Sequence, residues 1–197
     1  MLPDILLASK NYYKIEELRQ LLSPFGFNLK TAHDFEGTLD VIEDQPDLQG
    51  NALKKAEQWF KRTGLPSLAD DTGLEVDALN GGPGVYSARY AGEGATDADN
   101  FVRLLDELST APTRTARFRT VLAFVTVEET YLFEGVCHGR IVKQPKGEKG
   151  FGYDPVFQPD GYDKTFAELS PEVKNRISHR GRALQKFIQF LENRDQP

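Results

Sequence analysis

The chain has 197 residues, 39% of them hydrophobic and 27% charged, which suits one compact domain or two closely joined lobes around a sizeable core. Its formal net charge of -6 argues against a protein that binds nucleic acid through a basic surface, and its one cysteine excludes an intrachain disulfide framework. No apolar run reaches the roughly 18 to 20 residues that span a bilayer, and no export signal is recognisable. We therefore expect a single cytoplasmic domain over residues 1–197 that associates with neither membranes nor nucleic acid.

The N-terminal part of the chain predicts a strand, a loop and two helices. The apolar run 5–8 is typical of a buried strand, and Asn11 then stands at a helix N-cap position. Apolar residues follow at helical spacing until Pro24 and Gly26 end the helix. A second amphipathic helix should end near Gly64. Its apolar face is marked by Leu53, Ala56 and Phe60.

Turn signals and alternating apolar residues divide the middle of the chain. Residues 67–69 predict a short strand that delivers the acidic pair 70–71 at its end, and apolar residues alternate beyond the pair. The glycine-rich segment 81–84 predicts a tight loop. Thr96 or Asp97 could then cap a helix, because each has a side-chain oxygen that can accept from the first backbone N–H groups.

The stretch 116–137 has the strongest strand pattern in the sequence, with β-branched and aromatic residues throughout. Residues 128–130 are short enough for a hairpin turn, so we expect two long antiparallel strands here. A final helix should carry the apolar residues of 177–191. Because strands and helices intermix without strict alternation, the sequence predicts an α/β fold with a mixed sheet and flanking helices.

The segment 9–14, Ser-Lys-Asn-Tyr-Tyr-Lys, lies between the first strand and the first helix. Free backbone N–H groups and the positive end of a helix attract phosphate, and Lys14 could reach the same anion. The glycines of a Walker loop are missing, so an ordinary capped helix with a surface lysine is the competing interpretation.

The sequence has two acidic pairs, of which one is a candidate for metal binding or for activating water. Asp70 and Asp71 suit Mg²⁺, because an ion that also contacts phosphates needs only one or two carboxylates. The alternative is a turn with an Asx cap. Glu43 and Asp44, taken alone, suggest a solvated loop. No cysteine and histidine cluster has the spacing of zinc ligands, so zinc is not expected.

A third group of residues could recognise a flat ligand. The segment 151–155 places two aromatic residues around Gly152, where a ring could stack on a base for roughly 1 to 3 kcal/mol. A turn with core aromatics is the alternative. Lys174, His179 and Arg180 could donate hydrogen bonds to the edge of that base.

These blocks, in this order and spacing, resemble the inosine/xanthosine triphosphate pyrophosphatase family along nearly the whole chain. The matching segments are 9–14, 68–74, 83–90, 151–155 and 177–181. The resemblance implies Mg²⁺-dependent hydrolysis of ITP, dITP and XTP to the monophosphate and pyrophosphate, which cleanses the nucleotide pool. It also implies a homodimer and an elongated α/β fold whose two lobes form a central cleft.

The resemblance also assigns roles by position. Asp71 would be the general base and, with Glu43, a metal ligand, while Thr72 would contact the substrate. Residues implied at the triphosphate are Ser9, Lys10, Asn11, Tyr12, Tyr13, Lys14 and Lys55. Residues implied around the base and ribose are Phe151, Gly152, Tyr153, Asp154, Lys174, His179 and Arg180.

One block departs from the family pattern. Gly50 stands where the family commonly has Glu, and Asp44 or Asp47 could take the place of Glu43 at the metal. Two other functions compete with the one that the resemblance implies. The first is a related pyrophosphatase for other modified nucleotides, with the same architecture but another pocket. The second is a catalytically silent nucleotide sensor, which is favoured only if the Gly50 departure reflects loss of metal binding.

Overall fold

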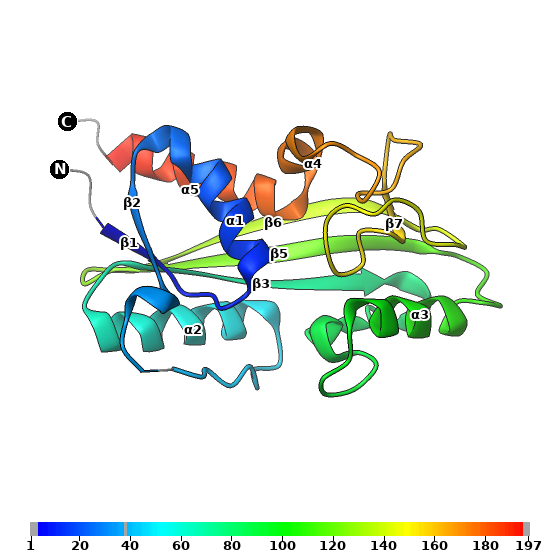
Figure 1. The fold of residues 1–197 in the computed structure, drawn as a ribbon, viewed down its shortest axis with the longest axis horizontal. Coiled ribbons are helices and arrows are strands. Elements are labelled where there is room, and N and C mark those ends of the chain that lie inside the picture. The colour runs from blue at the N-terminus through cyan, green and yellow to red at the C-terminus, as the bar shows by residue number, and fades with distance from the viewer. Residues whose placement is uncertain (1–3, 38, 195–197) are drawn as a thin grey trace. The chain divides into compact units, whose positions relative to one another are not determined.

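A computed structural model describes residues 4–37 and 39–194 of the chain (Figure 1). The chain divides into two compact units, each assembled from separate segments. Unit 1 consists of segments 1–71, 120–135 and 181–197, and unit 2 consists of segments 72–119 and 136–180. The expectation of one functional domain over the whole chain stays a prediction.

Helices and strands intermix along the chain. The α-helices are α1 (Tyr12–Leu22), α2 (Leu48–Thr63), α3 (Asp97–Glu107), α4 (Pro171–Ile177) and α5 (His179–Arg194). Short 3-10 turns occur at Ser23–Phe25, Ala32–Asp34, Asp77–Leu79 and Ser87–Arg89. The strands are β1 (Asp4–Leu7), β2 (Asn28–Thr31), β3 (Ser67–Val76), β4 (Pro83–Gly84), β5 (Thr115–Val125), β6 (Thr130–Ile141) and β7 (Phe157–Pro159). Within the described ranges, no helix has the length and apolarity needed to cross a membrane.

The strands form a mixed sheet in the order β2-β1-β3-β5-β6-β7, with β4 paired to β3. β1 pairs in parallel with β2 and β3, whereas β4 pairs antiparallel with β3 and β7 pairs antiparallel with β6. The predicted hairpin is confirmed, with its turn at 126–129, where the Thr126 hydroxyl accepts the N–H groups of Glu128 and Glu129. The predicted mixed α/β fold with flanking helices is therefore confirmed.

In unit 1, α1 and α5 cover one face of the strands and α2 covers the other (Figure 1). The α1 and α5 side is closed by a buried apolar cluster that excludes water. Its members are Ile5, Leu7, Ile15, Leu18, Leu22, Leu68, Leu122, Phe124, Ala183, Leu184 and Phe187. The loop between β1 and α1 is thereby held on a packed scaffold.

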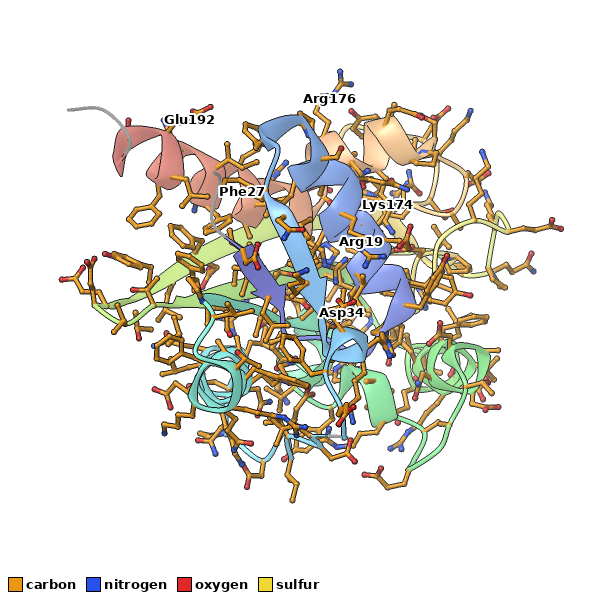
Figure 2. The ribbon with its side chains drawn as sticks, turned by 60° about the vertical axis from the view of Figure 1, so that its left-hand side comes forward. Arg19, Phe27, Asp34, Lys174, Arg176 and Glu192 are labelled. Carbon is orange, nitrogen blue, oxygen red and sulfur yellow. The ribbon has the colours of Figure 1, made fainter. Side chains whose placement is uncertain are left out.

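In unit 2, α3 and α4 lie on opposite sides of the strands (Figure 1). The core is rich in aromatic side chains, with the rings of Phe118 and Phe157 4.7 Å apart. Its buried members are Leu74, Val76, Leu104, Leu108, Ala116, Phe118, Cys137, Ile141, Tyr153, Val156, Phe157, Phe166 and Leu169. On the short helix α4, Lys174 is buried while Arg176 extends into solvent (Figure 2).

Local capping signals set the helix ends. The Asn11 side chain accepts the backbone N–H of Lys14 at 3.1 Å, which confirms the predicted N-cap of α1. Thr96 caps α3 and forms a capping box with Asp99, so of the two predicted candidates Thr96 is the cap. Gly64 adopts a left-handed φ of 69° and ends α2, as predicted.

The prediction of a strand that ends at the acidic pair is wrong, because β3 runs unbroken through Asp70 and Asp71. Their carboxylates bind lysines instead of capping a turn. Gly73 stands where β4 approaches closely: a Cβ there would lie 2.6 Å from the Gly84 carbonyl oxygen. The acidic pair therefore lies inside a strand and not in a turn.

Two helix predictions also need correction. The final helix is two helices, because Ser178 has an extended backbone (φ -68°, ψ 160°) that separates Ile177 on α4 from His179 on α5. The buried face of α2 differs from the predicted one, since Leu53 and Phe60 are only half-buried. The buried residues of α2 are Leu48, Asn51, Ala52, Lys55, Ala56 and Trp59. Two of them are polar, which apolar periodicity could not reveal.

Candidate active site

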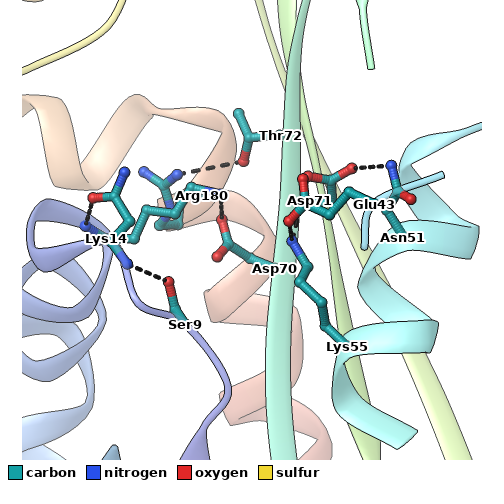
Figure 3. A network of polar contacts seen from close by, with 10 residues as sticks. Ser9, Lys14, Glu43, Asn51, Lys55, Asp70, Asp71, Thr72 and Arg180 are labelled. Atoms are coloured by element: carbon teal, nitrogen blue, oxygen red, sulfur yellow. Dashed lines mark hydrogen bonds and ion pairs between the residues drawn. The ribbon is translucent and has the colours of Figure 1, made fainter. Parts of the chain in front are cut away.

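In unit 1, hydrogen bonds cap the start of α1 at the loop that follows β1, and a capped helix start is a place where an anion can bind. The Ser9 hydroxyl accepts the Asn11 N–H at 3.2 Å, and Asn11 in turn accepts from Lys14 (Figure 3). The Lys14 ammonium lies 3.2 Å from the buried Asp70 carboxylate. This ion pair directs one positive charge to the N-terminal turn of α1, where the helix dipole also favours an anion.

The other predicted residues of the segment 9–14 differ in their surroundings. Lys10 forms an ion pair with Asp40, and 42% of its side chain is exposed. Tyr12 and Tyr13 are 67% and 56% exposed, with their rings in an edge contact at 5.8 Å. Their roles as substrate contacts stay predictions.

Four polar side chains of unit 1 converge beside the middle of β3. The Lys55 ammonium lies 2.6 Å from Glu43 Oε1 and 3.5 Å from Asp71 Oδ1. Asn51 Nδ2 donates to Asp71 Oδ2 at 3.1 Å (Figure 3). Asn51 and Lys55 are one helical turn apart on α2, so both reach Asp71 from the same helix face.

Burial and charge act against each other within this cluster. Burial raises the pKa of Asp71 above its usual range, although Lys55 and Lys14 pull it down. Burial alone would lower the pKa of Lys55, but the carboxylates of Asp71, Glu43 and Asp70 outweigh that effect and raise it. Lys55 is therefore cationic at neutral pH, and Asp71 is a stronger base than an exposed aspartate.

The donor set of this cluster fits a magnesium ion that also contacts substrate. Glu43 and Asp71 direct carboxylate oxygens at one cation, the Lys55 ammonium. Mg²⁺ prefers such hard oxygen donors and is commonly held by one or two carboxylates together with phosphates and water. Within residues 4–37 and 39–194, no group of three or more His, Cys, Asp or Glu side chains is arranged to hold a metal ion. Two carboxylates would leave coordination positions of such an ion for phosphate and water.

Local contacts account for the glycine at position 50, where the sequence departs from the family pattern. Asp47 is the N-cap of α2 and accepts the Gly50 N–H at 2.7 Å, while Asp44 binds Lys54 at 2.7 Å. A Cβ at Gly50 would lie 2.8 Å from the Gln45 Cβ, so this loop leaves no room for a side chain there. Of the three acidic residues, only Glu43 pairs with the lysine that also contacts Asp71, and the choice of metal carboxylate among them stays a prediction.

A second polar cluster lies in unit 2. Asp154 Oδ2 accepts from the Phe151 N–H at 3.0 Å and from the Lys174 ammonium at 2.7 Å. The same ammonium is 4.9 Å from the centre of the Phe151 ring. Asp154 therefore fixes both the aromatic loop and the lysine, and contact with substrate stays a prediction for it.

The remaining predicted residues of unit 2 differ in how buried and how constrained they are. Arg180 is 2% exposed, donates to the Thr72 hydroxyl at 3.3 Å and lies 5.7 Å from the Phe151 ring centre. His179 stacks on Phe118 at 4.5 Å. The structure thus brings Thr72, Phe151 and Arg180 together and places the His179 ring against the aromatic core.

Tyr153 is held by its hydroxyl, which donates to the Ser87 carbonyl at 2.8 Å. Burial raises the pKa of this phenol, so it remains a neutral donor. The Tyr153 hydroxyl therefore connects the aromatic loop to segment 83–90. That segment resembles the family, but the resemblance assigned no role to its residues.

Sequence reasoning missed two positioning contacts. Asp97 accepts the Gly152 N–H at 2.7 Å. The two residues are far apart in the sequence, which indicated only that Asp97 was a candidate helix cap. Asn51 binds Asp71, and its only sequence signal was its place beside Gly50 in the departing block.

The fold and these clusters define an α/β protein equipped with buried carboxylates, lysines at a helix start and an aromatic loop with cationic neighbours. The model of the Ham1 family matches residues 5–190, and the chain belongs to this family. A dITP/XTP pyrophosphatase of Desulfotalea psychrophila is 48% identical, over 98% of this chain and 91% of the relative. The expected family is therefore confirmed.

Solved structures agree. A HAM1 protein from Coxiella burnetii is 40% identical with a TM-score of 0.90, covering 98% of this chain and all of the other. A nucleoside-triphosphatase / dITP/XTP pyrophosphatase from Mycobacterium abscessus is 45% identical with a TM-score of 0.77, over 93% of this chain and 98% of the other.

Proposed function

We propose that this protein hydrolyses dITP, ITP and XTP to the monophosphate and pyrophosphate and so removes deaminated purines from the nucleotide pool. The observation that supports this most directly is the buried Asp71 carboxylate, held by Asn51 and Lys55 in a chain that is 48% identical to a dITP/XTP pyrophosphatase. The expected enzyme class, a hydrolase acting on acid anhydrides, agrees with the names of its relatives.

The residues of unit 1 would bind the triphosphate. A nucleoside triphosphate carries about four negative charges, which an acidic protein must neutralise locally. The backbone N–H groups of the segment 9–14 and the Lys14 ammonium suit phosphate oxygens, and Lys55 adds a second cation. Asp71, whose pKa is raised by burial, would orient a water molecule and accept its proton.

Glu43 and Asp71 would hold a magnesium ion, whose chemistry is to neutralise charge on the polyphosphate. Lys55, which lies between these carboxylates, would keep them close together while neither is compensated by metal. The carboxylates would otherwise repel one another in a buried setting.

The residues of unit 2 would recognise the base. The Phe151 ring offers a stacking surface, and Lys174 and Arg180 are cationic donors beside it. Hypoxanthine and xanthine present an O6 acceptor, whereas adenine presents an amino group and would leave a buried donor unpaired. Guanine also has O6, so its rejection requires a contact near C2.

We further propose a homodimeric, cytoplasmic enzyme that requires no nucleic-acid partner. The family resemblance supports the dimer. The acidic composition, with a net charge of -6, supports the absence of nucleic acid.

Incubating the purified protein with a panel of nucleoside triphosphates tests the function. We expect hydrolysis of dITP, ITP and XTP with release of pyrophosphate rather than orthophosphate, and loss of activity when EDTA removes divalent ions. Faster hydrolysis of another modified nucleotide would instead support the related pyrophosphatase. Binding without turnover would support the silent sensor, which the glycine at position 50 made an alternative.

Lys14→Ala should raise KM for dITP and lower kcat, because a cation beside a desolvated polyphosphate acts in both the ground state and the transition state. Losing one charged hydrogen bond of about 1.5 to 3 kcal/mol predicts roughly a 10- to 150-fold fall in kcat/KM. Steady-state kinetics check this. Lys10→Ala is the comparison variant: Lys10 is also predicted at the triphosphate, but it is exposed and pairs with Asp40, so its loss should matter less. Equal kinetics in wild type and Lys14→Ala would place the triphosphate elsewhere.

A further inference from the structure

Asn51 lies inside the carboxylate cluster with almost no exposure to solvent, at 1%. Its amide nitrogen donates to Asp71 Oδ2 at 3.1 Å, and its amide oxygen accepts the backbone N–H of Gln45 at 3.0 Å. An amide nitrogen only donates and an amide oxygen only accepts, so the two bonds together fix the orientation of the side chain. Neither bond can be exchanged for one to water without opening the cluster.

These bonds close a ring of contacts around the proposed metal position. Asn51 binds Asp71, Asp71 contacts Lys55 at 3.5 Å, and Lys55 binds Glu43 at 2.6 Å. The chain then runs from Glu43 to Gln45, whose N–H returns to Asn51. A displacement of the Asn51 amide would therefore shift both carboxylates. Asp71 would move because it is hydrogen-bonded to the amide, and Glu43 would move with the backbone of the loop before α2.

We propose that Asn51 is a positioning residue that holds Asp71 and the Glu43 loop in register for the metal and the substrate. Only the expected change in kcat rests on the proposed function; the expected changes in hydrogen exchange and in Mn²⁺ binding do not. Asn is suited to this place because it supplies one donor and one acceptor from a short, buried side chain. Aspartate would keep an acceptor for Gln45 but would face Asp71 with a second carboxylate, and alanine would lose both bonds.

Two substitutions separate the hydrogen bond from Asn51 to Asp71 from the hydrogen bond between Asn51 and Gln45. Asn51→Asp should retain the Gln45 bond and lose the Asp71 bond, whereas Asn51→Ala should lose both. Lys54→Ala is the control. Lys54 also lies on α2 and also contacts the loop before it, through an ion pair with Asp44 at 2.7 Å. A melting curve for each variant shows whether the protein still folds.

Hydrogen exchange of the metal-free protein provides a readout that needs no catalysis. We expect the peptide containing the Gln45 amide to exchange faster in Asn51→Ala than in wild type, and near the wild-type rate in Asn51→Asp. Mn²⁺ binding, followed by electron paramagnetic resonance on the folded variants without nucleotide, should weaken by about 10- to 100-fold in both. Lys54→Ala should bind Mn²⁺ as wild type does.

The kinetic expectation is a fall in kcat of about 10- to 100-fold in both Asn51 variants, with a smaller change in KM for dITP. Wild-type kcat and wild-type Mn²⁺ affinity in a folded Asn51→Asp would overturn the proposal. So would unchanged Gln45 exchange in Asn51→Ala. If wild type hydrolysed no nucleotide, the proposed function would fail, while the exchange and Mn²⁺ measurements would still decide the role of Asn51.

Discussion

Asp71→Asn should lower kcat for dITP by about 10²- to 10⁴-fold, the range over which a general base contributes. The substitution preserves the shape of the side chain but removes its charge and its basicity. Asp71 is the carboxylate whose pKa burial raises and which Asn51 and Lys55 both contact. Single-turnover hydrolysis with saturating Mg²⁺ measures the chemical step directly.

Asp70→Asn is the matched control for this prediction. Asp70 is the adjacent residue of β3 and pairs with Lys14 at 3.2 Å, so its loss should weaken activity less. The ratio of the two effects separates the chemical role from the shared cost of removing a buried charge. If Asp71→Asn kept near-wild-type turnover while folded, Asp71 would not be the base. Equal losses in both variants would point to electrostatics of the strand as a whole.

Much of the fold could be predicted because its signals are local. Asn11 and Thr96 cap helices through bonds to residues within one turn, and the alternation over 116–137 specifies a hairpin. The break at Ser178 could not be predicted in this way. Apolar residues continue on both sides of it, so periodicity alone predicted one helix where the structure has two.

The candidate site shows where sequence reasoning reaches its limit. Asp71 was predicted as a site residue because neighbouring carboxylates suit a metal ion and because the family resemblance places a base there. Its place inside β3 was missed because the same residues also suggest a turn. Asn51 and Asp97 bind partners that lie 20 and 55 residues away in the chain. Such pairings depend on how strands and helices meet in space, and no short motif encodes them.

The proposal that Arg180 recognises the base leads to a prediction about substrate selectivity. Arg180 is 2% exposed, donates to the Thr72 hydroxyl at 3.3 Å and stands 5.7 Å from the Phe151 ring centre. Its guanidinium has further N–H groups that could donate to O6 of hypoxanthine or xanthine. Arg180→Ala should therefore damage hydrolysis of ITP and XTP far more than the slow background reaction with ATP.

The loss of one base-reading contact should cost about 1 to 3 kcal/mol in kcat/KM for ITP, or roughly 5- to 150-fold, and little for a base that never satisfied the donor. The quantity to measure is the ratio of kcat/KM for ITP to that for ATP, in wild type and in the variant. Arg182→Ala is the matched control, because Arg182 lies on the same helix but is exposed, and its ratio should not change.

A purely structural role for Arg180 predicts a different pattern. If the side chain only anchors the start of α5 through Thr72 and Phe151, then Arg180→Ala should lower the melting temperature and reduce all nucleotide activities in proportion. A structural role also predicts that Thr72→Val, which removes the hydroxyl that accepts from Arg180, lowers the melting temperature in the same way. A constant ITP to ATP ratio in Arg180→Ala, together with a lower melting temperature, would remove Arg180 from the base pocket and leave Lys174 as the cationic donor beside Phe151.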